Sequence, residues 1–214
     1  MNNFVLTGLV VIFSIVWSSA FIAGAIALTD FDPFTLLTIR FLLSALLMLP
    51  ICLSCGGFRS STHGDRIAIR RGLLLGVLNN ALYLGLSLVG VVVISGVASG
   101  VQIDIWGVLM ATGGMLAFAS GTVFFRGQGA GLPVLQANFW QSIAGAVALL
   151  PMAMVFGQPL TVPSTATMIA IAHLVLVVTI GGMSLWLVLI RISGASTASS
   201  YHLLNPFFGV LLAY

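Results

Sequence analysis

The chain alternates between long apolar stretches and short polar connections. Each apolar stretch is about 20 residues long, the length at which a helix crosses a ~30 Å hydrocarbon core. Only helices and closed barrels satisfy their backbone in lipid, and these continuous runs lack the alternation of barrel strands. The pattern therefore predicts an all-α polytopic transmembrane bundle of seven hydrophobic segments: Leu6–Leu28, Pro33–Leu53, Gly72–Ile94, Trp106–Phe125, Val134–Phe156, Met168–Ile190 and a last one from about Thr197.

Composition supports a membrane setting for these helices. Hydrophobic residues make up 60% of the 214-residue chain and charged residues only 5%, whereas a soluble domain carries about 25% charge. The first stretch is too long for the apolar core of a cleaved signal peptide, and no basic segment precedes it. We therefore expect it to be a span.

The few charged residues divide between two sets of connections. The second, fourth and sixth connections hold Arg59, Arg66, Arg70, Arg71, Arg126 and Arg191, and the odd-numbered ones hold Asp30, Asp32 and Asp104. Because cytoplasmic loops are enriched in Arg and Lys, this bias predicts a multi-pass protein of the bacterial inner (plasma) membrane with a cytoplasmic N-terminus. The basic residues are too sparse to indicate a nucleic-acid partner.

Two cysteines lie close together at the end of the second stretch. Cys52 and Cys55 stand in the order Cys-Leu-Ser-Cys, and His63 follows them. A structural zinc site needs four ligands at recognisable spacing, which this segment does not offer. We interpret the cysteines as small apolar residues at a helix end, and we expect no metal and no cofactor.

The two halves of the chain resemble each other at an offset of about 100 residues. Val16–Phe21 corresponds to Ala117–Thr122, and Pro33 corresponds to Pro133 at the start of the next span. The Arg bias gives the two copies opposite orientations in the membrane. Inverted-topology repeats are typical of secondary transporters, which hold substrate near the midplane between the copies.

Several short motifs occur in an order that resembles one transporter family. They are Trp17-Ser18-Ser19-Ala20-Phe21, Asp32-Pro33 followed by Arg40-Phe41, Ala81-Leu82-Tyr83-Leu84-Gly85-Leu86-Ser87 and Leu203-Leu204-Asn205-Pro206. Together they resemble the EamA-type branch of the drug/metabolite transporter superfamily. The resemblance implies ten spans in two inverted five-helix repeats, and export or exchange of small metabolites. We accordingly divide the chain into a first repeat, 1–95, and a second repeat, 96–214.

The chain departs from that family pattern in two places. After Ser87 it runs into Gly90-Val91-Val92-Val93-Ile94-Ser95-Gly96, which resembles the end of the family's fifth span, so about two spans are expected to be missing. The second repeat stops at Tyr214, before a tenth span. We expect either a shortened relative or an incomplete sequence, and both put transport competence in question.

Polar and aromatic side chains inside the spans are candidates for a substrate site. Arg40 is the charged residue inside a span, where it either clamps an anion or ties down helix ends. Asn79 and Tyr83 share one helix face and need either a cavity or interhelical hydrogen bonds. Trp17 is expected to line a cavity, and Trp140 lies either on a cavity wall or in the interfacial aromatic belt.

The sixth and last spans carry further candidates. Trp186 lies nearer the cytoplasmic end of the sixth span and is a candidate for the interfacial belt. Because no Asp or Glu lies inside a span, proton coupling would fall to His202 or His173, or to the missing segments. Asn205 is a further lining candidate, and Pro206 interrupts the last span, so we interpret it as a gating point.

The sequence favours a secondary transporter that exports or exchanges a small polar metabolite, such as an amino acid, by alternating access. A non-transporting membrane fragment or assembly subunit is the alternative, and an intramembrane enzyme is a second one. We expect no enzyme, because the chain has no G-x-S-x-G elbow and, without Lys, no phosphate-binding P-loop. The expected partners are a small-molecule substrate and the lipid bilayer, with a homodimer left open. The expected substrate-binding residues are Trp17, Arg40, Asn79, Tyr83, Trp140, His202 and Asn205.

Overall fold

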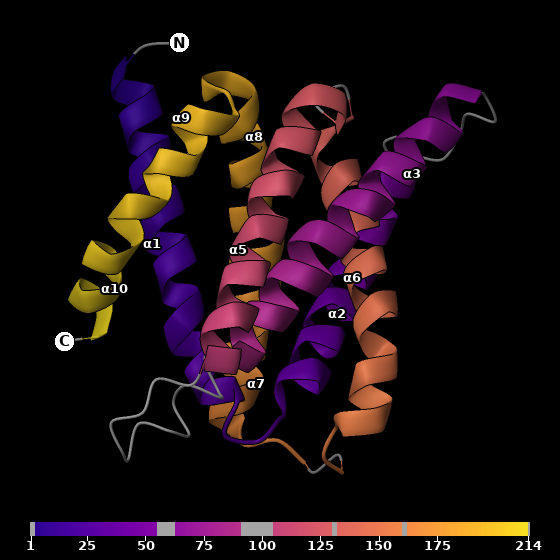
Figure 1. Ribbon diagram of the computed structural model, residues 1–214, viewed down its shortest axis with the longest axis vertical. Coiled ribbons are helices and arrows are strands. Elements are labelled where there is room, and N and C mark those ends of the chain that lie inside the picture. Colours follow the sequence, from indigo (N-terminus) through magenta and orange to yellow (C-terminus); the bar gives the residue numbers. More distant parts are fainter. Residues whose placement is uncertain (1–2, 55–62, 91–104, 130–131, 160–161, 214) are drawn as a thin grey trace.

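The structure is a bundle of helices (Figure 1). It is a computed structural model that describes residues 3–54, 63–90, 105–129, 132–159 and 162–213, and these ranges contain no strand. In chain order the elements are α1 (Asn3–Ala27), α2 (Pro33–Ser54), α3 (His63–Gly76), η1 (Val77–Leu84), α5 (Ile105–Phe124), η2 (Phe125–Gly129), α6 (Val134–Phe156), α7 (Thr165–His173), η3 (Leu174–Gly182), α8 (Met183–Ser193), α9 (Ala195–Ser200), η4 (Tyr201–Leu204) and α10 (Asn205–Ala213).

The helices match the predicted membrane segments. In the described ranges, six helical segments are long and apolar enough to cross a bilayer: Asn3–Ala27, Pro33–Ser54, Ile69–Gly90, Ile105–Gln128, Val134–Phe156 and Thr165–Ser193. The predicted all-α polytopic bundle is therefore confirmed. The seventh predicted segment is an interrupted helix, because Gly194 at φ 83° ends α8 and the 3-10 turn η4 divides α9 from α10.

Basic and acidic residues lie at opposite ends of the bundle. At one end Arg71 donates to the Gln128 carbonyl at 2.8 Å and Arg126 donates to the Arg191 carbonyl at 2.8 Å. The N-terminus and the α8–α9 junction lie at this end, while the α1–α2 connection and the start of α7 lie at the other (Figure 1). Consecutive segments thus alternate in direction, and α1 runs opposite to α5 as the inverted repeat predicts. Which end is cytoplasmic stays a prediction.

The acidic end is tied together by two aspartates. Asp30 accepts a hydrogen bond from the Ser164 N–H at 2.8 Å, and this bond holds the pKa of Asp30 below its ordinary value. Asp32 caps the start of α2 and also accepts from the Gln158 N–H at 3.2 Å. Partial burial opposes ionisation of Asp32, but its hydrogen bonds together outweigh that effect and lower its pKa.

Glycines allow the third span to approach two neighbours closely. A Cβ on Gly76 of α3 would collide with the Gln141 carbonyl of α6, and a Cβ on Gly72 would lie 2.6 Å from the Trp140 Cβ. On the other side, a Cβ on Gly121 of α5 would collide with the amide oxygen of Asn79. The third span is therefore held between α5 and α6 at positions that only glycine fits.

Several predictions fall outside the described residues. The expected shortening after Gly90 concerns residues 91–104, which include Asp104, and Cys55 also lies outside the described ranges. Cys52 is buried. Among the residues that were placed, no group of three His, Cys, Asp or Glu side chains could hold a metal ion. The division of the chain at residue 95 stays a prediction.

Candidate functional site

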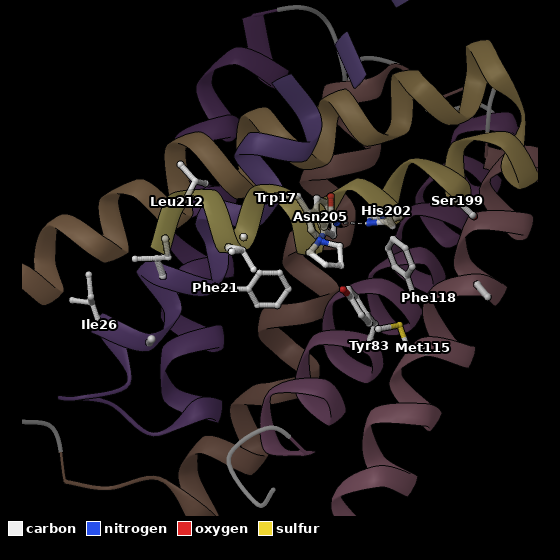
Figure 2. Close-up of a pocket in the computed structure, with 16 residues that line it drawn as sticks. Trp17, Phe21, Ile26, Tyr83, Met115, Phe118, Ser199, His202, Asn205 and Leu212 are labelled. Atoms are coloured by element: carbon white, nitrogen blue, oxygen red, sulfur yellow. Dashed lines mark hydrogen bonds between the residues drawn. The ribbon is translucent and has the colours of Figure 1, made fainter. Parts of the chain in front are cut away.

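A large cavity opens between α1, η1, α5 and the interrupted helix α9–α10. Its volume is about 1090 Å³. Figure 2 shows Tyr83 and Phe118 pointing towards the segment that carries His202 and Asn205, with Trp17 behind them. Most of the lining side chains are apolar. We call this space the open cavity.

A smaller cavity lies deeper in the bundle, between α1, α2, η1 and η3. Its volume is about 200 Å³, and Arg40, Phe41 and Thr179 are among its lining residues. Trp17 and Tyr83 line both cavities, so they stand where the two spaces meet. We call this space the inner cavity.

The ring of His202 packs within a group of aromatic side chains from α1, α5 and α8. Its centroid lies 4.6 Å from that of Trp186, 5.1 Å from Trp17, and 5.2 Å from both Phe13 and Phe118, all in edge contacts. We call these five residues the aromatic cluster. Such edge-to-face contacts stabilise aromatic pairs beyond the area that they bury. They also tie the interrupted helix to the rest of the bundle.

Asn205 holds the interrupted helix in two further ways. Its side-chain nitrogen lies 2.9 Å from Nδ1 of His202, drawn as a dashed line in Figure 2. Its backbone carbonyl accepts a hydrogen bond from the Ser18 hydroxyl of α1 at 2.9 Å. The amide oxygen of Asn205 is buried and has no hydrogen-bond partner among the described residues. Asn205 therefore lines the open cavity as a residue, while its amide oxygen is covered by protein.

Arg40 lies buried on α2 and reaches the inner cavity. Its Nε donates to the Thr179 hydroxyl at 2.6 Å, and its guanidinium carbon lies 5.6 Å from the centre of the Phe41 ring. The Thr179 hydroxyl in turn donates to the Leu174 carbonyl at 2.8 Å, within the π-helical element η3. The Thr179 hydroxyl therefore accepts a hydrogen bond from Nε of Arg40 and uses its own proton to bind the Leu174 carbonyl, which fixes the orientation of the guanidinium.

Amide side chains extend this arrangement into α6 and η1. Asn138 donates to the Thr179 carbonyl at 2.8 Å, and Gln141 donates to the Asn138 amide oxygen at 3.2 Å. Asn80 of η1 donates to the Gln141 carbonyl at 2.9 Å. We call Arg40, Asn80, Asn138, Gln141 and Thr179 the polar network. It links four elements through hydrogen bonds in the interior of the bundle.

Most of the predicted site residues meet around the two cavities. Trp17 and Tyr83 line both, Arg40 lines the inner one, and the open one is lined by His202, Asn205 and Pro206. Pro206 lies in the first turn of α10, where its missing N–H costs little. The interruption of the last span therefore precedes Pro206, in the turn η4.

Two predicted residues lie elsewhere. Asn79 is fully buried against Gly121 of α5, and Trp140 packs beside Gly72 of α3 and against the Phe139 ring. Neither residue lines a described cavity, because both sit at close helix crossings, so their substrate role stays a prediction that this geometry does not support. The belt position expected for Trp186 is wrong: its side chain is fully buried in the aromatic cluster.

Sequence reasoning missed Phe118, Asn138 and Thr179. The internal repeat contained the signal for Phe118, because it is the counterpart of Trp17 and the two rings lie 6.0 Å apart. Asn138 is a buried polar residue inside a span, which is by itself a reason to expect a functional or structural role. No pattern in the sequence marks Thr179 as the partner of Arg40.

A serine–histidine contact elsewhere joins α1 to α7. Ser19 Oγ lies 2.8 Å from Nε2 of His173. The same hydroxyl lies 2.8 Å from the Val16 carbonyl of its own helix, so the serine proton has an acceptor besides the histidine.

Comparison with known proteins gives one match. The sequence model of the EamA-like transporter family matches residues 6–102 and again residues 105–214. No curated protein and no solved structure matches the chain. The two matched ranges together cover nearly the whole sequence.

Proposed function

Because this chain belongs to the EamA-like transporter family, a membrane transporter family of the drug/metabolite transporter superfamily, we propose that it is a secondary transporter. It exports or exchanges a small polar metabolite, such as an amino acid, by alternating access. The observation that supports this most directly is the meeting of the open and inner cavities at Trp17 and Tyr83. Transporters of the inverted-repeat kind hold substrate at such an interface between the two copies.

The interrupted helix is the proposed moving wall. It lines one side of the open cavity. Among the described residues, the bond from the buried Ser18 hydroxyl to the Asn205 carbonyl is the side-chain hydrogen bond that joins it to α1. Breaks in a transmembrane helix are tolerated where they line a cavity, and they absorb the backbone changes of gating. Pro206 and the turn η4 are the proposed gating point, and Trp17, Tyr83, His202 and Asn205 are the proposed contacts with substrate.

The orientation is proposed from the distribution of charge. The Arg-rich end lies on the cytoplasmic side of a bacterial inner membrane, and the N-terminus lies with it. Single cysteines at Arg66 and Arg126, in a chain whose two native cysteines are replaced, should react with an impermeant reagent from the same face. A single cysteine at Asp30 should react from the opposite face. Reactivity of the first two from different faces would contradict the orientation.

Counterflow in proteoliposomes tests transport itself. Vesicles loaded with a high concentration of unlabelled solute should transiently accumulate the same labelled solute from outside if the protein exchanges it. Protein-free vesicles and vesicles with Tyr83→Ala protein are the controls. Folded, reconstituted protein that gives no counterflow with any of a panel of amino acids and organic acids would favour the non-transporting alternative.

A further inference from the structure

Arg40 is a buried cation for which the described residues supply no counter-ion. Only 8% of its surface is exposed. The chain has four Asp and no Glu, and the carboxylates of Asp30 and Asp32 are engaged at the acidic end of the bundle, with Ser164 and Gln158. An unpaired charge inside a bundle is costly, and such residues usually mark the path or the site of a ligand.

The hydrogen bond at Nε leaves one edge of the guanidinium for a ligand. A guanidinium has two edges that can donate two parallel N–H bonds, and Thr179 occupies Nε on one of them. The other edge, formed by the two terminal nitrogens, can still bind a planar oxyanion through a bidentate pair of hydrogen bonds. Because Arg40 lines the inner cavity, an anion in that cavity can meet this edge.

The number of charges indicates a monoanion. The remaining described arginines outside α2 lie at the Arg-rich end, where Arg71, Arg126 and Arg191 donate to backbone carbonyls. One buried guanidinium balances one carboxylate, whereas a phosphate monoester carries about −1.5 to −2 charges at neutral pH and would leave excess charge buried. A second buried cation would be needed for a phosphate, and the described part of the cavity wall has none.

The other walls of the inner cavity indicate the rest of the ligand. Leu36, Leu37, Phe41, Leu174 and Val178 line it, and these side chains favour an apolar body. No described residue brings a carboxylate that would pair with the ammonium group of an amino acid. If an amino acid bound here, its carboxylate would pair with Arg40, but its ammonium group would be left as a buried charge without a partner.

We propose that the inner cavity binds a monocarboxylate with an apolar body, and that the Arg40 guanidinium holds the carboxylate. This inference rests on the proposed transport function and revises its substrate: a monocarboxylate with an apolar body takes the place of the amino acid given there as the example. Thr179 is a positioning residue in this site, because it acts through the orientation of Arg40.

Equilibrium binding to the purified full chain in lipid nanodiscs tests the proposal. The probes are 3-phenylpropanoate, its uncharged amide, L-phenylalanine and inorganic phosphate, and hexanoate serves as an aliphatic carboxylate. We expect 3-phenylpropanoate or hexanoate to bind at least about tenfold more tightly than the amide, L-phenylalanine and phosphate, because only the carboxylates gain the charge-assisted bond. Equal binding of acid and amide, or tighter binding of L-phenylalanine or phosphate, overturns the proposal. Binding of neither carboxylate overturns it too.

Two variants locate the effect. Arg40→Gln should abolish the preference of 3-phenylpropanoate over its amide, and Arg66→Gln, which removes an exposed arginine, should keep it. Retention of the preference in Arg40→Gln contradicts the assignment. If Arg40→Gln does not fold, Arg40→Lys keeps the charge without the planar guanidinium and should reduce the preference for 3-phenylpropanoate over its amide. The comparison of probes on the unchanged protein tests the carboxylate site without any variant.

The experiment separates this inference from the proposed function. Carboxylate-selective binding without any counterflow would contradict transport and leave the site assignment standing. Counterflow of a solute that is unaffected by Arg40→Gln would support transport and contradict the carboxylate site.

Discussion

The polar network and the aromatic cluster border different cavities and are built differently: Arg40 and Thr179 line the inner cavity, whereas Phe118 and His202 line the open cavity. The polar network joins α2, α6, η1 and η3 by directional hydrogen bonds, and glycines bring the third span into close contact with α6. The aromatic cluster joins α1, α5, α8 and η4 by ring contacts, which tolerate small shifts. We interpret the polar network as a fixed wall that carries the charge of Arg40, and we propose that the interrupted helix, which contacts the aromatic cluster, is the wall that moves during transport.

The largest expected effect comes from the fixed wall. Gly76→Leu places a branched side chain where even a Cβ would collide with the Gln141 carbonyl. We expect it to cost more than about 3 kcal/mol of unfolding free energy and to prevent recovery of monodisperse protein. Size-exclusion chromatography and thermal unfolding in detergent measure this. Gly8→Ala, at a glycine with no atom within 4 Å of the added Cβ, is the matched control and should fold normally. Normal folding of Gly76→Leu would show that α3 and α6 are not in close contact.

A smaller effect is expected where the fixed wall meets the ligand. Thr179→Val removes the acceptor that orients Arg40 and keeps the side-chain shape. The carboxylate should bind with about 1 kcal/mol less free energy, roughly a fivefold increase in Kd, while the amide is unaffected. Calorimetric titration with 3-phenylpropanoate and with its amide measures the change in each Kd. Thr112→Val, whose hydroxyl bonds only within its own helix on the exposed face, should change neither Kd. An equal loss for acid and amide would mean that Thr179 acts on folding and not on Arg40.

A change in the interrupted helix should alter the rate of transport and leave the binding affinity unchanged. Pro206→Ala restores a backbone donor just after η4 and favours a continuous last helix. We expect turnover in counterflow to fall roughly fivefold while equilibrium binding is unchanged, because gating changes rates without changing ground-state contacts. Pro163→Ala, in the connection before α7, is the control proline. A change in Kd with unchanged turnover would place Pro206 in the binding site and remove it from the gate.

The smallest expected effect concerns the hydrogen bonds of Asp32 that connect α2 with the segment after α6. Asp32 links the start of α2 to the segment after α6, and its folded pKa lies below the usual 3.8. Its contribution to stability is therefore present above about pH 4 and is lost as the pH falls through the folded pKa. Because the carboxylate is only partly buried and solvent screens its interactions, Asp32→Asn should cost at most about 0.5 kcal/mol at pH 7.

Unfolding measured between pH 3 and pH 7 checks the sign of this effect. The difference between the unchanged chain and Asp32→Asn should shrink as the pH falls towards 3. A difference that grows in acid would show that Asp32 carries a raised pKa and is not stabilised as a carboxylate.

The fold followed from hydropathy because each span is one continuous apolar run that needs no partner to be recognised. Arg40, Trp17 and Tyr83 could be selected because polar and large aromatic groups are conspicuous at mid-span, and the structure brings them to one pair of cavities. The pairing of Asn138 with Thr179 could not be predicted, since it depends on how helices 41 residues apart lie side by side and on a π-helical turn. Asn79 was selected by the same polar criterion, yet it faces Gly121 at a helix crossing.

Counterflow in proteoliposomes decides whether the meeting point of the two cavities is a transport site. Vesicles containing the unchanged chain should transiently accumulate labelled solute, and vesicles containing folded Tyr83→Ala protein should not. Accumulation that persists in Tyr83→Ala, or none at all with folded protein that binds its ligand, would show that transport does not run through this site.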